Sequence, residues 1–139
     1  MNKIILTWGD IELQTNDLAE QLKYSRFDGI IAVTKGGMIP AALLAKKLGI
    51  DLIETVCIKS YTADNNREQI ELIKMTPYPE RNWLIVDDLV DSGNSFRYLR
   101  KYLPNSMYAV LYAKPHGMSH TDYYSMEMAQ EEWLVFPWE

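Results

Sequence analysis

The segment from Trp83 to Tyr102 constrains the fold more than any other part of the chain. It opens with four apolar residues, continues with the paired acids Asp87 and Asp88, passes through a small polar loop around Gly93 and enters an amphipathic stretch. An apolar strand followed by a glycine loop and a helix is the repeating unit of parallel α/β proteins. The segment therefore predicts a strand of a parallel sheet, with polar residues at the carboxyl end of that strand.

A second segment repeats this plan. Residues 29–33 form an apolar run, Thr34-Lys35-Gly36-Gly37 forms a glycine loop, and residues 38–48 have a helical pattern that Gly49 ends. The remaining patterns predict strands over 52–59 and 107–113 and a helix over 10–24. We expect an α/β fold with a mostly parallel central sheet flanked by helices, formed by residues 1–139 as a single domain.

Two stretches do not fit this alternation. Residues 61–77 are polar for most of their length, and so long a connection in a compact domain is either a functional lid or simply a mobile loop. After residue 115 the pattern weakens, and the chain ends in a Trp/Pro-rich stretch. We expect the C-terminal segment, about 115–139, to form a small irregular hood with the N-terminal residues over one edge of the sheet.

Composition limits the location and the partners of the protein. With 139 residues, 47% of them apolar, the chain can bury a core without disulfide or metal staples, and its single cysteine, Cys57, lies in an apolar run. No stretch has the character of a transmembrane segment or a signal peptide, so we expect a cytoplasmic protein. A net charge of −5 without a Lys/Arg cluster argues against a nucleic-acid partner.

The loop at 91–95 has the composition of a phosphate-binding site. Its backbone N–H groups can converge on one anion at the start of a helix, and Ser95 adds a hydroxyl. Asp87 and Asp88 would repel that anion unless they face other groups, such as ribose hydroxyls or a hard cation. A phosphorylated sugar together with Mg²⁺ satisfies all of these groups. Alternatively, the acids only cap the helix and solvate the loop, although three carboxylates around one glycine loop weigh against that interpretation.

The loop Thr34-Lys35-Gly36-Gly37 should lie at the same edge of the sheet, because it also follows a strand and precedes a helix. Its glycines let the backbone approach an anion, and Lys35 supplies a positive charge. The loop lacks the spacing of a Walker motif, and on its own it is typical of an ordinary turn. Beside the loop at 91–95, it offers a second anion site within reach of one molecule.

These motifs resemble those of the phosphoribosyltransferase family. Residues 86–93, Val-Asp-Asp-Leu-Val-Asp-Ser-Gly, look like its phosphoribosyl pyrophosphate signature. Nearly the whole chain is similar to the bacterial xanthine-guanine members of the family, through residues 30–37, 55–58, 64–68 and 113–115. The resemblance implies a Mg²⁺-dependent purine-salvage enzyme that transfers a phosphoribosyl group to guanine, xanthine or hypoxanthine and releases pyrophosphate. It also implies a homodimer or homotetramer whose substrates are small molecules.

The resemblance assigns roles to individual residues. The loop 91–95 would hold the 5′-phosphate, and the acid pair before it would serve the ribose hydroxyls and Mg²⁺, with Asp88 as the direct metal ligand. Lys35 and Gly36 would bind the pyrophosphate, and Arg67 would close over it from the polar segment. The implied phosphoribosyl pyrophosphate site comprises Lys35, Gly36, Arg67, Asp87, Asp88, Asp91, Ser92, Gly93, Asn94 and Ser95.

The resemblance also implies a purine site. Asp91 would face the purine N7 as a general acid or base, and Lys114 would donate a hydrogen bond to the purine O6. Trp133 would stack on the ring beside Leu134. The implied catalytic residues are Asp91, Lys35 and Arg67.

Two positions differ from the usual pattern of this family. Lys35 stands where an arginine is common, which keeps the charge but gives up bidentate hydrogen bonding. Asn94 stands where a glycine is common, and asparagine tolerates a left-handed backbone better than most residues. Neither change removes an implied role.

Two other functions share part of this pattern. A phosphoacceptor receiver domain also binds Mg²⁺ with acids that follow an apolar strand. In chains that resemble such domains, the acid pair lies near the N-terminus and a separate acceptor aspartate lies at mid-chain. Here all three acids lie in one loop after residue 86. A catalytically silent regulator would keep the phosphoribosyltransferase fold to sense a ligand or bind RNA, but the acidic balance and the presence of Arg67, Asp91 and Lys114 argue against it.

Overall fold

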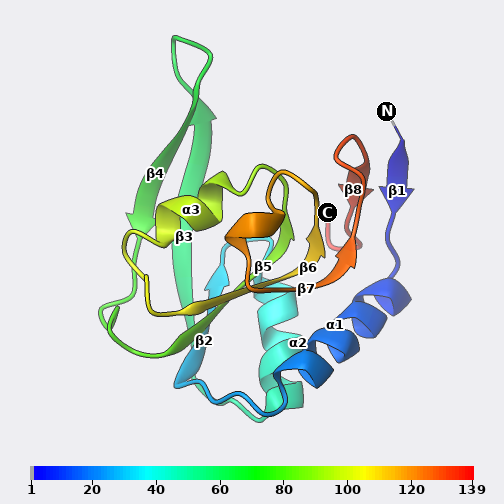
Figure 1. Ribbon diagram of the computed structural model, residues 1–139, viewed down its shortest axis with the longest axis vertical. Coiled ribbons are helices and arrows are strands. Elements are labelled where there is room, and N and C mark those ends of the chain that lie inside the picture. Colours follow the sequence, from blue (N-terminus) through cyan, green and yellow to red (C-terminus); the bar gives the residue numbers. More distant parts are fainter. Residues whose placement is uncertain (1) are drawn as a thin grey trace.

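The structure, a computed structural model, describes residues 2–139 and is built around a six-stranded sheet in the order β4-β3-β2-β5-β6-β7 (Figure 1). The β3–β4 pair is antiparallel, and the other neighbouring pairs are parallel. The expected mostly parallel sheet is therefore confirmed. Its strands are β2 (Gly29–Val33), β3 (Ile53–Thr62), β4 (Glu68–Lys74), β5 (Trp83–Val90), β6 (Met107–Ala113) and β7 (Tyr123–Glu127).

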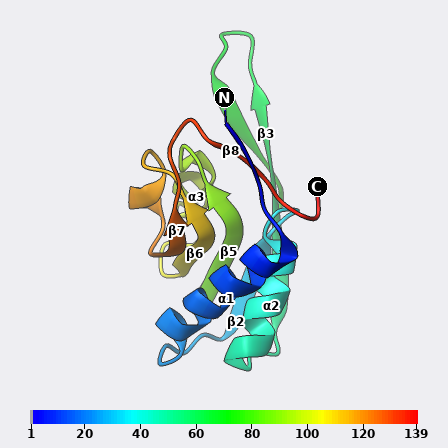
Figure 2. The same ribbon diagram turned by 90° about the vertical axis from the view of Figure 1, so that its right-hand side faces the viewer.

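Helices cover the sheet on both faces, as Figure 2 shows from the side. The central strands send alternate residues to the two layers: Ile30 and Leu84 pack with α1 and α2, and Ile31 and Ile85 pack with α3. Burial on both faces explains why these strands are continuous apolar runs in the sequence. No helix within residues 2–139 combines the length and the apolarity needed to cross a bilayer. The helices are α1 (Trp8–Leu22), α2 (Met38–Leu48) and α3 (Asn94–Leu99).

The order of the strands creates a switch point between β2 and β5. From β2 the chain passes through α2 to β3 on one side, and from β5 it passes through α3 to β6 on the other side. Because such crossovers are right-handed, α2 and α3 lie on opposite faces of the sheet. The loops at 34–37 and 91–93 therefore start side by side at the carboxyl ends of neighbouring strands, where open parallel sheets bind ligands.

The first helix begins at Trp8, earlier than its apolar pattern predicts. The Thr7 hydroxyl accepts a hydrogen bond from the backbone N–H of Asp10 at 3.1 Å, and the Asp10 carboxylate accepts one from the N–H of Thr7 at 2.8 Å. This capping box satisfies free backbone groups and sets the start of the helix. The second helix has its expected bounds, because Gly49 ends it in the left-handed conformation with φ 68°.

The polar segment 61–77 is largely a β-hairpin, so its description as a loop was wrong. β3 continues to Thr62 and pairs with β4 across a short turn at 63–67. In β4, Ile70 and Leu72 alternate with polar residues and are half-buried, which is a strand pattern that the overall polarity concealed. The hairpin projects beyond the rest of the sheet (Figure 1). Its mobility and its closure over a ligand stay predictions.

The two ends of the chain lie side by side, as expected for the hood. β1 (Lys3–Ile5) pairs in parallel with β8 (Trp133–Val135) (Figure 1). Leu134 and Phe136 anchor this pair to the core beside α1. The segment 115–139 is more regular than expected, because β7 extends the main sheet beside β6.

Candidate active site

The loop after β2 touches the acid pair of β5. An ideal Cβ on Gly36 would lie 2.5 Å from Oδ2 of Asp88, so that nothing larger than a hydrogen atom fits between this loop and the carboxylate. The peptide bond between Thr34 and Lys35, which leads into Gly36, is cis. The expectation that the two loops share one edge of the sheet is thus confirmed.

Asp87 and Asp88 form a partly buried carboxylate pair. Burial raises the pKa of both groups, and that of Asp87 lies well above its usual range because the charge of Asp88 adds to the effect. The backbone N–H of Asp88 donates to Oδ1 of Asp87 at 2.8 Å. Among residues 2–139, no Lys, Arg or His forms an ion pair with either carboxylate. A cation or a hydroxyl-bearing ligand would offset this uncompensated charge.

The loop after β5 curves around a cavity of about 210 Å³. Gly93 has φ 83°, and a side chain at this position would overlap the ring of His120. The left-handed residue of the loop is therefore Gly93 and not Asn94, which is the first residue of α3. The cavity is lined by Ser60, Glu68, Asp87, Asp88, Leu89, Val90, Asp91, Ser92, Gly93, Asn94, Ser95 and Phe96.

Three residues predicted for phosphoribosyl pyrophosphate, Lys35, Gly36 and Arg67, do not line this cavity, although Gly36 touches Asp88. The side chains of Lys35 and Arg67 are exposed to solvent. Arg67 is the last residue of the turn of the β3–β4 hairpin, where its backbone N–H donates to the side chain of Asn65 at 3.1 Å. The next residue, Glu68, reaches the loop 91–95, since its carboxylate accepts a hydrogen bond from Nδ2 of Asn94 at 3.1 Å. The hairpin therefore contacts the loop 91–95 through Glu68, the neighbour of Arg67, which is expected to close over pyrophosphate.

A second cavity, of about 200 Å³, lies between the end of β5 and the hood. Lys114 is 5% exposed, and its Nζ lies 3.6 Å from Oδ2 of Asp91. Trp133 is 53% exposed and borders this cavity. All four residues predicted for the purine line this cavity, which adjoins the first because Asp88, Leu89 and Asp91 border both. Its lining comprises Asp88, Leu89, Asp91, Lys114, Trp133, Leu134, Phe136 and Glu139.

Gln130 and Glu68 contact the site but were not predicted. Gln130 precedes β8, and its Nε2 donates to Oδ1 of Asp91 at 2.6 Å. In the sequence it belongs to the polar run Gln130-Glu131-Glu132, which has the pattern of a solvated turn and gives no signal of this contact. The alternation in β4 was a signal for Glu68, because a hairpin over 61–77 brings the start of its second strand near the loops.

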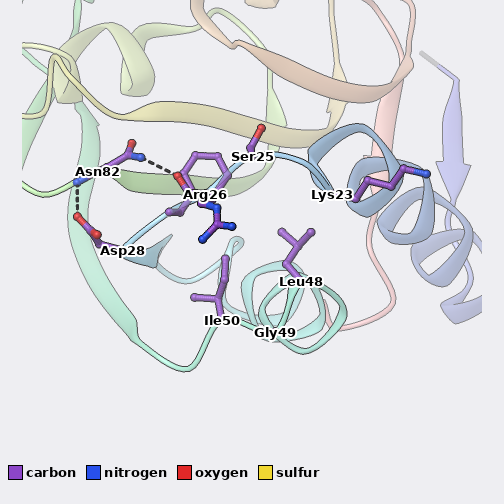
Figure 3. A pocket seen from close by; sticks show the side chains of 9 residues that line it. Lys23, Ser25, Arg26, Asp28, Leu48, Gly49, Ile50 and Asn82 are labelled. Carbon is purple, nitrogen blue, oxygen red and sulfur yellow. Dashed lines mark hydrogen bonds between the residues drawn. The ribbon is translucent and has the colours of Figure 1, made fainter.

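A larger cavity, of about 510 Å³, lies where the chain enters β2 and β5 (Figure 3). There the side-chain amide of Asn82 donates to the carbonyl of Arg26 at 2.7 Å, and the backbone N–H of Asn82 donates to the carboxylate of Asp28 at 2.9 Å. None of the predicted site residues lines this cavity. Ligands of parallel sheets bind at the carboxyl ends of the strands, so the two smaller cavities form the candidate active site.

The architecture and the site define a ligand-binding α/β protein, with an acid pair and a glycine loop at the switch point of its sheet. The model of the phosphoribosyl transferase domain family matches residues 1–139. The chain belongs to the phosphoribosyltransferase family. The resemblance seen in the motifs is confirmed, and the receiver-domain alternative is excluded.

The similarity to known proteins covers nearly all of the chain. The xanthine-guanine phosphoribosyltransferase of Chromohalobacter salexigens is 41% identical over 134 residues, which cover 96% of this chain and 82% of that protein. The crystal structure of a purine phosphoribosyltransferase from Pyrococcus horikoshii has a TM-score of 0.84 at 30% identity, covering 100% of this chain and 95% of the other. A Neisseria gonorrhoeae protein with bound ppGpp also has a TM-score of 0.84, at 28% identity, covering 99% and 89%.

Proposed function

We propose that the chain is a purine-salvage phosphoribosyltransferase. It converts guanine, xanthine or hypoxanthine and 5-phospho-α-D-ribose 1-diphosphate into the nucleoside 5′-monophosphate and pyrophosphate. The observation that carries this function is the pair of adjoining cavities. A loop rich in backbone N–H groups borders one, a buried lysine and an exposed tryptophan border the other, and Asp88 and Asp91 belong to both. The activity in the name of the Chromohalobacter relative and the guanine nucleotide bound by the Neisseria protein support this choice of substrates.

The phosphorylated sugar binds at the loop 91–95. Backbone N–H groups at the start of α3, together with the hydroxyls of Ser92 and Ser95, hold the 5′-phosphate. Asp87 and Asp88 accept hydrogen bonds from the ribose hydroxyls. These bonds are favourable because the two carboxylates are partly buried and have no cationic partner. The sugar then lies between the two cavities, with its C1 toward the base.

Asp88 is the residue that we assign to Mg²⁺. The uncompensated carboxylates suit a hard cation, and the described residues contain no group of three or more His, Cys, Asp or Glu side chains that would enclose one. That donor set fits Mg²⁺, which commonly takes one or two carboxylates together with the phosphates of its substrate. The bound ion supplies neutralisation of the pyrophosphate charge. Lys35 from the β2 loop and Arg67 from the hairpin add positive charge at the same group.

The reaction is a substitution at C1 of the ribose. The purine N9 forms the new bond to C1 while the bond from C1 to the pyrophosphate oxygen breaks, and its electron pair stays on that oxygen. Asp91 takes the proton that the purine loses at N7, and Lys35 and Arg67 stabilise the charge gained by pyrophosphate. Closure of the β3–β4 hairpin excludes water, which otherwise competes with the purine as nucleophile.

Lys114 and Trp133 select the base. A lysine ammonium has three donors and no acceptor, so it matches the carbonyl at C6 of guanine, xanthine and hypoxanthine and opposes the amine of adenine. Lys114 is buried, so its charge cannot turn to solvent when the wrong base enters. Trp133 stacks on the purine ring beside Leu134.

We also propose that the enzyme is a cytoplasmic homodimer or homotetramer. The family resemblance suggests this state, and exposed apolar side chains on β1 and α1, such as Ile5, Trp8 and Leu13, support it because subunit contacts would cover them. Light scattering after size exclusion measures the mass in solution. A monomer at micromolar concentration would refute this part of the proposal alone.

The function is tested with purified chain, phosphoribosyl pyrophosphate, Mg²⁺ and each of guanine, xanthine, hypoxanthine and adenine. We expect nucleoside monophosphate and pyrophosphate from the 6-oxopurines and none from adenine. Absence of product from all four bases, in a sample whose circular dichroism shows it folded, would refute the enzyme. Binding of a nucleotide by calorimetry would then favour the catalytically silent regulator.

A further inference from the structure

Gln130 links the hood to the carboxylate that faces both cavities. It lies in the turn between β7 and β8, and its side-chain amide has two partners. Its Oε1 accepts a hydrogen bond from the backbone N–H of His116 at 2.9 Å, and its Nε2 donates to Oδ1 of Asp91 at 2.6 Å. The backbone of one loop and the side chain of another therefore meet on a single amide.

These partners fix the orientation of the amide. A backbone N–H can only donate, so the atom that faces His116 must be the carbonyl oxygen of Gln130, and the NH₂ group must face Asp91. Oδ1 of Asp91 is consequently held as an acceptor. The other oxygen, Oδ2, lies toward Lys114, with 3.6 Å between it and Nζ.

The turn that carries Gln130 is closed by its own hydrogen bonds. The N–H of Ala129 donates to the carboxylate of Glu132 at 2.8 Å, and the N–H of Glu132 donates to the carbonyl of Ala129 at 3.1 Å. β8 begins at the next residue, Trp133, which lines the purine cavity. One rigid turn thus sets both the tryptophan and the partner of Asp91, whose side chain is 61% exposed and would otherwise rotate in solvent.

We propose that Gln130 is a positioning residue for phosphoribosyl transfer, which holds Oδ1 of Asp91 so that Oδ2 is left to take the proton from purine N7. This inference rests on the proposed function. In the step, the N7–H bond breaks, the proton joins Oδ2, and Gln130 keeps both of its N–H protons. An amide suits this task because it donates to a carboxylate without giving it a proton.

Charged residues surround the Asp91 carboxylate in both cavities. Lys114 is the cation among them, and a carboxylate at position 130 would be nearer to Asp91 than Lys114 is. The other charged residues that border the two cavities are Glu68, Asp87, Asp88 and Glu139.

Gln130→Glu puts a carboxylate of the same shape against Asp91. Because a like charge raises the pKa of a carboxyl group, the acidic limb of the pH profile of kcat/KM for guanine should move up by about one pH unit. Gln130→Met keeps the length of the side chain and removes both hydrogen bonds. For this variant we expect a loss in kcat of roughly 10-fold, part of what general acid–base catalysis contributes, with little change in the pH limb. KM for phosphoribosyl pyrophosphate should stay within about 2-fold of wild type in both, because Gln130 does not border the phosphate cavity.

Two controls separate positioning from support of the fold. Gln21→Glu is matched to Gln130→Glu, because Gln21 also donates to an aspartate, Asp17, at 3.0 Å, but on α1 away from both cavities. We expect wild-type kinetics from it. Glu132→Ala removes the side-chain hydrogen bond of the turn but keeps the backbone bond from Glu132 to Ala129 and both bonds of the Gln130 amide, so its pH limb should stay in place.

An unmoved pH limb in Gln130→Glu would overturn the proposal, and so would an equal shift in Glu132→Ala. A wild-type chain without transferase activity is a different result, because it refutes the proposed function before any variant is compared. The contact itself is then judged by titrating the Asp91 carboxyl carbon by NMR. A higher pKa in Gln130→Glu than in wild type supports the hold on Asp91, and equal values refute it.

Discussion

Gly36→Ala is the most direct test of the contact between the two loops of the site. The added methyl would lie 2.5 and 2.9 Å from the two oxygens of Asp88 and 2.8 Å from the carboxyl carbon. Non-bonded heavy atoms rest at roughly 3.5 Å, so either the carboxylate or the loop must move by about 1 Å. Gly36 does not have a positive φ, so its backbone conformation accepts alanine and the effect of the substitution comes from the clash alone.

The stability cost of Gly36→Ala should be small. The clashing atoms are the end of a side chain that can turn, and overpacking of about 1–3 kcal/mol is partly offset by about 0.4–1 kcal/mol of lost chain entropy in the unfolded state. We expect a net loss of about 1 kcal/mol in the free energy of unfolding. Activity should fall much more, because a displacement of about 1 Å at a reacting centre can cost roughly 100-fold.

The assay is kcat/KM for phosphoribosyl pyrophosphate over a series of Mg²⁺ concentrations. We expect Gly36→Ala to need more Mg²⁺ and to remain below wild type at saturation. Gly9→Ala is the matched control, because its methyl would meet only the Thr7 hydroxyl, at an ordinary 3.5 Å, and lies in α1. It should raise Tm slightly and leave the kinetics unchanged. Wild-type kcat/KM in Gly36→Ala at limiting Mg²⁺ would contradict the assignment of Asp88 to Mg²⁺ and of Gly36 to the pyrophosphate.

Three further changes probe the rest of the site. Lys114→Gln should lose most of its rate with guanine and hypoxanthine and narrow the gap to adenine, since an amide can accept as well as donate; unchanged kcat/KM for all purines would place the base elsewhere. Gly93→Ala should lower Tm and weaken phosphoribosyl pyrophosphate binding in calorimetry, because φ 83° disfavours a side chain and His120 occupies its space. Burial raises the pKa of Asp87 above its ordinary 3.8, so the folded state binds this proton more tightly than the unfolded state, and the group lowers stability as pH rises from about 4 through the raised pKa. Asp87→Asn should therefore raise Tm at pH 7 and flatten its pH dependence, and thermal melts with a falling or unchanged Tm would contradict this sign.

Much of the fold could be predicted because its signals are local. The bounds of β2 and α2 follow from a continuous apolar run and from the glycine at 49, which act within a few residues. The start of α1 depended on one hydrogen-bonded pair, Thr7 with Asp10, that an apolar pattern does not reveal. The hairpin was missed because one half-buried face, with Ile70 and Leu72, is diluted by polar residues on the other.

Part of the candidate site could likewise be predicted from the sequence, and part of it could not. The loop 91–95 and its acid pair are contiguous, so one stretch of sequence contained the complete lining of the 210 Å³ cavity apart from the hairpin residues. The contacts of Gln130 with Asp91 and of Glu68 with Asn94 join residues far apart in the chain. Nothing in the polar turn indicates the partner of Gln130, and the alternation in β4 places Glu68 near the loops without naming Asn94, because the tertiary fold brings these residues together.

The switch point explains how a chain with a net charge of −5 can hold a polyanionic substrate. Because α2 and α3 lie on opposite faces, their preceding loops open toward the same space between β2 and β5, and backbone N–H groups can point at the ligand from the start of α3. Lys114 borders the second cavity, and the proposal adds Lys35 from the loop after β2 and Arg67 from the hairpin, so the proposed positive charge is local even though the protein is acidic. The partly buried acids at 87 and 88 cost stability without a cation, and the proposed Mg²⁺ of the substrate would offset this cost. Binding at this edge of the sheet therefore depends on the geometry of two neighbouring strands rather than on the overall charge.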